Sequence, residues 1–115
     1  MEIARGDIVL CVIAGDYGKP RPALIIQSDL FNEVHPSIAL LPITSHLIDT
    51  PLFRILVKAS KASGLNQASQ IMVDKVTAVR RDRIRERIGK ISPAILKHVD
   101  ECLQRFLGLE VKSDL

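Results

Sequence analysis

Three short runs of aliphatic residues, rich in β-branched side chains, fall within the first 44 positions of the 115-residue chain and constrain its fold more than any other feature. They occupy 8–13, 23–27 and 37–44. Each run is short, and Gly, Pro, Asp or Ser residues stand at its borders, a pattern typical of buried strands separated by turns. We therefore expect three core strands at the start of the chain.

Weaker strand patterns follow in the second half of the chain. We predict strands over 53–57 and 70–73, joined through a segment in which Ser63-Gly64 marks a turn. A last strand is expected over 87–91, at a sheet edge where its Lys and Arg side chains discourage pairing with another chain.

One long helix is expected at the C-terminal end. Ser92 caps it, Pro93 takes its first position and Gly108 ends it. Apolar residues recur at helical spacing and predict a stripe packed on the sheet, formed by Ile95, Leu96, Val99, Leu103, Phe106 and Leu107. A short helical turn capped by Ser28 or Asp29 is also expected. Together, these strands and helices predict a mostly-β or α+β fold, a small β-barrel with a terminal helix.

Composition bounds the class of protein. The length suits one domain over 1–115, and because only 3% of residues are aromatic, the core must come from Ile, Leu, Val and Ala. We place Phe31 and Phe106 in that core. Cys11 and Cys102 stand apart and lack metal-ligand spacing, which predicts two buried thiols. No apolar run of about 18 residues or signal peptide occurs, so we expect a cytoplasmic protein with no membrane partner.

Arg21 lies between Pro20 and Pro22, where a loop leads into an apolar strand. The prolines restrict φ at their own positions and extend the residue before each, so the guanidinium starts from a nearly preset backbone. That arrangement favours binding an anion such as phosphate, and the net charge of +3 mildly favours a polyanionic partner. The alternative is a solvated arginine at a strand entrance.

Thr44, Ser45 and His46 follow an apolar strand at the point where it becomes polar. Period-two alternation predicts Thr44 and His46 on one face and Ser45 on the other. Adjacent strands lie about 4.8 Å apart, so this cluster and Arg21 can converge on one ligand. The alternative is an ordinary polar turn whose hydroxyls bond nearby backbone.

With these motifs, the chain resembles the MazF/PemK family of toxin endoribonucleases. The resemblance rests on the stretches RGDIV (5–9), RPALIIQSDLFN (21–32) and LPITS (41–45) and on the segment 103–109. It implies an SH3-like barrel of the CcdB/MazF/PemK type, a homodimer, and cleavage of single-stranded RNA without a metal or other cofactor. It also implies a separately encoded antitoxin, whose acidic, extended tail occupies the RNA groove.

By matching position, the resemblance makes Arg21 and Thr44 the catalytic pair. Family cleavage uses the RNA 2′-hydroxyl as nucleophile, and Arg21, which stays protonated, would stabilise the developing charge. We expect RNA contacts from Lys19, Ser45 and Lys75.

The sequence also departs from the family pattern. The loop over 14–20 is shorter than in many members. An arginine of the PemK branch, two residues before a functional aspartate, is absent at Met72, although Asp74 is kept. Thr77 replaces another arginine that many MazF members carry. His46 could compensate as an acid or base, since its unperturbed pKa lies near neutrality. Asp74 is a second auxiliary candidate.

Two other hypotheses about the function remain. One is a toxin like CcdB, which binds DNA gyrase and cuts nothing; the other is a barrel that binds nucleic acid without cleavage. The basic run 80–87 could contact RNA, but the interleaved Asp82 and Glu86 favour a solvated, salt-bridged turn.

Overall fold

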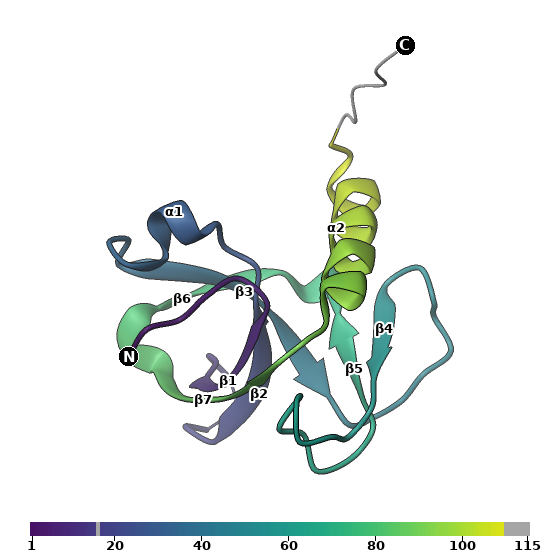
Figure 1. Ribbon diagram of the computed structural model, residues 1–115, viewed down its shortest axis with the longest axis horizontal. Coiled ribbons are helices and arrows are strands. Elements are labelled where there is room, and N and C mark those ends of the chain that lie inside the picture. The colour runs from purple at the N-terminus through teal and green to yellow at the C-terminus, as the bar shows by residue number, and fades with distance from the viewer. Residues whose placement is uncertain (16, 110–115) are drawn as a thin grey trace.

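The computed structural model, which describes residues 1–15 and 17–109, forms one curved antiparallel sheet with a C-terminal helix (Figure 1). The sheet path is β4-β5-β3-β2-β1-β7, and β6 pairs with β3 beside it. The strands are β1 (Asp7–Val12), β2 (Pro20–Ile25), β3 (Ser37–Thr44), β4 (Arg54–Val57), β5 (Ser69–Met72), β6 (Thr77–Arg80) and β7 (Ile84–Lys90). The helices are α1 (Asp29–Asn32), α2 (Pro93–Leu107) and the 3-10 turns η1 (Val73–Lys75) and η2 (Arg81–Arg83).

The predicted class, a mostly-β or α+β fold with short helices and a terminal helix, is confirmed. The sheet is not closed, because β4 and β7 end its path and do not pair within the described part of the chain. The strand β3 holds the sheet together. One edge pairs with β2, while Ser37 to Leu40 pair with β6 and Ile43 and Thr44 pair with β5.

Two hydrophobic clusters explain why the early strands read as unbroken apolar runs. One contains Ile8, Leu24 and Leu41 and is covered by α2 through Val99, Cys102 and Leu103. The other contains the alternate residues, among them Val9, Ala23 and Leu40. Because β1, β2 and β3 are buried on both faces, they lack the alternation of a half-exposed strand.

The predicted helix boundaries are confirmed. Ser92 caps α2 by accepting from the backbone N–H of Ile95, and Gly108 ends it with φ +69°. Ser28 caps α1 in the same way. The two cysteines are buried and free, as expected.

Two predictions about individual segments were wrong, and one strand was missed. Phe31 and Phe106 are 51% and 39% exposed instead of buried; the end of α2 projects beyond the sheet, where the Phe106 ring packs edge-on against Phe53 (Figure 1). The strand β6 was not predicted, because only Val79 in it is buried. In the basic run, 81–83 form a turn and Arg80 pairs with Asp82 at the surface, as predicted, but β7 begins at Ile84, three residues before the predicted start.

The residues around Arg5 and Asp29 join three separate parts of the fold. The Arg5 guanidinium pairs with Asp100 of α2, and its Nε donates to the Ile26 carbonyl at 2.9 Å. The Arg5 backbone N–H donates to Oδ1 of Asp29 at 2.8 Å, and the Asn32 amide donates to the same oxygen at 2.9 Å. One junction therefore joins the N-terminal segment, α1 and α2.

Asp29 makes this junction sensitive to acid. The backbone N–H of Arg5 and the amide of Asn32 hold the pKa of the Asp29 carboxyl below its usual range. A lowered pKa stabilises the fold above the unfolded value, and that stabilisation is lost as the pH falls through the folded value. We expect Asp29→Asn to be less stable than wild type near pH 7, with the difference shrinking as the pH falls through the lowered pKa of Asp29. Urea unfolding between pH 7 and 2 measures this; Asp49→Asn, at an exposed loop carboxylate, is the control, and a pH-independent difference would contradict the prediction.

Candidate active site

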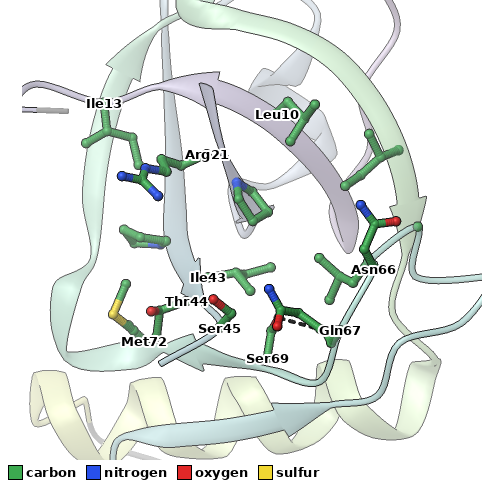
Figure 2. Close-up of a pocket in the computed structure, with 15 residues that line it drawn as sticks. Leu10, Ile13, Arg21, Ile43, Thr44, Ser45, Asn66, Gln67, Ser69 and Met72 are labelled. Carbon is green, nitrogen blue, oxygen red and sulfur yellow. Dashed lines mark hydrogen bonds between the residues drawn. The ribbon is translucent and has the colours of Figure 1, made fainter. Parts of the chain in front are cut away.

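A cavity of about 460 Å³ opens where the ends of β2 and β3 meet the loop before β5 (Figure 2). The wall is about equally polar and apolar, and its polar side chains come from three segments. The lining residues are Leu10, Ile13, Arg21, Pro22, Pro42, Ile43, Thr44, Ser45, Gly64, Leu65, Asn66, Gln67, Ser69, Met72 and Ile88.

Strand pairing brings Arg21 and Thr44 to the same cavity. Ala23 of β2 pairs with Pro42 of β3 in antiparallel register. Arg21 lies two residues before Ala23 and Thr44 two residues after Pro42, so the two residues reach the same end of the strand pair. Both side chains line the cavity, which supports the expectation that they converge on one ligand (Figure 2).

Thr44 has a defined hydrogen-bonding state. Its Oγ1 accepts a hydrogen bond from the backbone N–H of His46 at 3.1 Å. A hydroxyl offers one hydrogen and two lone pairs. The bond to His46 uses a lone pair, so the Thr44 hydroxyl hydrogen remains available to a ligand in the cavity.

The predicted alternation of Thr44, Ser45 and His46 was wrong. The strand β3 ends at Thr44, so the period of two does not continue into the next residues. Ser45 lines the cavity with Thr44, while His46 is exposed and not among the lining residues. The His46 imidazole is therefore not part of the cavity wall.

The other predicted site residues also lie outside the cavity lining. Lys19 is exposed before β2, and Lys75 is exposed on η1. Asp74, also on η1, forms an ion pair with Arg54, with 3.4 Å between Oδ1 and Nε. At this separation the contact is electrostatic and not a well-formed hydrogen bond.

The ion pair between Arg54 and Asp74 was not predicted from the sequence. Arg54 pairs across β4 and β5 with Met72, the position at which the family arginine is absent. Its side chain is 11% exposed and does not line the cavity. A guanidinium thus stands next to Asp74 from the neighbouring strand, and nothing in the local sequence around Asp74 indicates it.

A second wall of polar residues was also missed. Asn66, Gln67 and Ser69 lie across the cavity from Arg21 (Figure 2). The only sequence signal was a polar stretch after the turn at Gly64, and such stretches are common in exposed loops.

The described residues contain no group of three or more His, Cys, Asp or Glu side chains placed to hold a metal ion. No helix within 1–15 and 17–109 is long and apolar enough to span a membrane.

Comparison with known proteins places this site in context. A family model described as PemK-like, MazF-like toxin of type II toxin–antitoxin systems matches residues 4–107. A probable endoribonuclease MazF from Mycolicibacterium smegmatis is 41% identical over 106 residues, covering 91% of this chain and 96% of that protein.

Solved structures share the fold. MazF from Deinococcus radiodurans superposes with a TM-score of 0.80 at 21% identity, over 95% of this chain and 99% of that one. A mycobacterial endoribonuclease in complex with its cognate antitoxin gives 0.79 at 18% identity, over 96% and 99% of the two chains.

Proposed function

The chain belongs to the PemK-like, MazF-like toxins of type II toxin–antitoxin systems, and on that premise we propose that it is an endoribonuclease that cuts single-stranded RNA at selected sequences. The observation that carries the site assignment is the convergence of Arg21 and Thr44 from adjacent strands on one cavity. A permanent cation beside a hydroxyl donor suits a phosphodiester better than a neutral substrate.

The proposed reaction is an internal transesterification. The 2′-oxygen attacks the adjacent phosphorus and forms a new P–O bond, and the bond to the 5′-oxygen breaks. The proton lost by the 2′-hydroxyl is balanced by protonation of the leaving 5′-oxygen. The products are a 2′,3′-cyclic phosphate and a 5′-hydroxyl, and the reaction consumes no water.

Arg21 supplies charge in this scheme. Its guanidinium does not lose a proton in proteins and so is no general base. Its five donors match two phosphate oxygens at once, and their charge grows as the phosphorane forms. Arg21 is therefore assigned to transition-state stabilisation.

Thr44 positions the phosphate. Its oxygen accepts from the His46 backbone N–H at 3.1 Å, so its hydrogen remains available to donate to a phosphate oxygen. Ser45, on the same wall, offers a second hydroxyl. The His46 ring and the Asp74 carboxylate lie outside the cavity lining, and we assign neither to proton transfer.

Lys19 and Lys75 are proposed to contact RNA phosphates on either side of the cut, since both ammonium groups are exposed outside the cavity. Partners follow from the family. The chain would act as a homodimer in the cytoplasm, where its RNA substrate is found, and a cognate antitoxin would neutralise it by laying an acidic, extended segment over the RNA site.

A single assay tests the proposal. The purified protein is incubated with a mixed-sequence RNA in the presence of a chelator, and the fragment ends are analysed. We expect fragments with cyclic phosphate and 5′-hydroxyl ends. RNA that is bound and left whole would favour a non-cleaving barrel, and inhibition of gyrase without RNA cleavage would favour the CcdB-like alternative. Cleavage that stops in chelator would contradict the metal-free reaction.

A further inference from the structure

The wall of the cavity that faces Arg21 carries neutral amide groups. Asn66 and Gln67 come from the loop between β4 and β5, and both line the cavity (Figure 2). Neither carries a charge, so this wall has no electrostatic preference for phosphate. A carboxamide offers a donor and an acceptor side by side, which is the pattern that the edge of a nucleobase presents.

These two carboxamides are not used by the fold. In the described part of the chain, neither side chain makes a hydrogen bond to another protein group. The carboxamides of Gln27, Asn32 and Gln70 are engaged; that of Gln70, for example, bonds the Ile48 N–H and carbonyl at 3.1 and 2.8 Å. Asn66 and Gln67 thus keep their donors and acceptors for a ligand.

The loop that carries them is held firmly. Ser63 is 3% exposed, and its hydroxyl donates to the Lys58 carbonyl at 3.0 Å and accepts from the Leu65 N–H at 3.2 Å. The Ala62 carbonyl accepts from the Lys90 N–H of β7 at 2.9 Å. Ser69 donates to the Gln67 carbonyl at 3.0 Å. Such a loop needs little ordering of its backbone when a ligand binds.

The space between the walls suits the flat face of a base. Leu10, Ile43, Leu65 and Ile88 line it with aliphatic surface. The volume of about 460 Å³ falls in the range of small-molecule sites. A base can therefore lie against aliphatic side chains with its edge toward the amides and its phosphate toward Arg21.

We propose that Asn66 and Gln67 read an unpaired base next to the scissile phosphate and favour adenine. This inference rests on the proposed function. Asn and Gln pair bidentately with the N6 and N7 atoms of adenine, donating to N7 and accepting from N6. Phosphate contacts position an RNA and base contacts specify its sequence, so this wall sets which RNAs are cut.

The test uses isosteric changes that replace the amide donor with a negatively charged acceptor. Wild type, Asn66→Asp and Gln67→Glu are each given an RNA with randomised positions, and the 5′-hydroxyl ends are sequenced. We expect wild type to prefer adenine at one position beside the cut. In the variants this preference should fall by about 5- to 150-fold, with a gain for cytosine, whose N4 amino group donates to carboxylates.

Two further variants keep the test decisive. Gln67→Ala removes the amide without adding charge and should flatten the preference, while Gln104→Glu makes the same chemical change on α2 and should alter nothing. Thermal unfolding checks that each variant is folded. If wild type cuts RNA with no adenine preference, or the variants keep the wild-type preference, this inference is overturned while the proposed function stands. If wild type cuts no RNA, the proposed function fails and the inference with it.

Discussion

Arg21→Ala is expected to slow RNA cleavage about 100- to 1,000-fold, the loss typical of removing one charge-stabilising donor from an active site. Arg21 is exposed at the start of β2, so its side chain contributes little to the core. Thermal unfolding should therefore stay close to wild type. Single-turnover cleavage at saturating protein measures the chemical step apart from RNA binding.

Two variants sharpen this result. Arg21→Lys keeps the charge and loses the bidentate fork, so we expect most of the rate loss to remain. Arg105→Ala removes the same charge from α2 and should cleave at the wild-type rate. Wild-type rates in both Arg21 variants would refute the assignment of Arg21 to the reaction.

The second large effect is on stability, and it arises where two backbones cross. A Cβ added to Gly64 would lie 2.0 Å from the carbonyl oxygen of Ile88 in β7. One added to Gly89 would lie 2.3 Å from the carbonyl carbon and oxygen of Ser63. These neighbours are backbone atoms, which cannot rotate away, so the close approach of the loop to β7 requires glycine on both sides.

We expect Gly64→Ala to lower the free energy of unfolding by about 2–5 kcal/mol, from about 1–2 for a left-handed alanine and about 1–3 for the overpacked contact. Gly108 is a matched control, since its φ of +69° nearly equals the +72° of Gly64 and nothing lies within 4 Å of its added Cβ. Gly108→Ala should cost only the first part. Urea unfolding at one protein concentration measures both; equal losses would mean that the crossing is not tight.

The strands that form the core could be predicted because buried strands consist of short apolar runs, which are visible in the local sequence. The strands β1 to β3 are apolar on both faces, and the predicted 37–44 strand matches β3 at both ends. The strand β6 was not predictable in this way, because three of its four side chains are not buried. Its place depends on pairing with β3, which lies far away in the sequence.

The site residues also fall into two groups: some can be predicted from local sequence, and others depend on contacts between distant segments. Arg21 and Thr44 could be found because one lies at the start and the other at the end of a recognisable strand, and antiparallel pairing brings these two positions together. Asn66 and Gln67 reach the cavity only because their loop crosses β7. Arg54 reaches Asp74 from a neighbouring strand. The pattern of residues within one segment does not indicate such contacts between segments. The prediction for His46 was wrong because it extended the alternation of strand side chains beyond Thr44, where β3 ends.

The pairing of β1 with β7, and of Arg5 with Asp100, also determines when the chain can complete its folding during synthesis. A chain is made from its N-terminus, and domains generally fold as units. Here the first strand needs the last one, and the N-terminal junction needs a residue of the terminal helix. During synthesis β1 therefore waits for almost the whole polypeptide before its second edge is covered. A nascent toxin built this way stays unfinished until translation is nearly over, which leaves little opportunity for a partial chain to act on RNA near the ribosome that makes it.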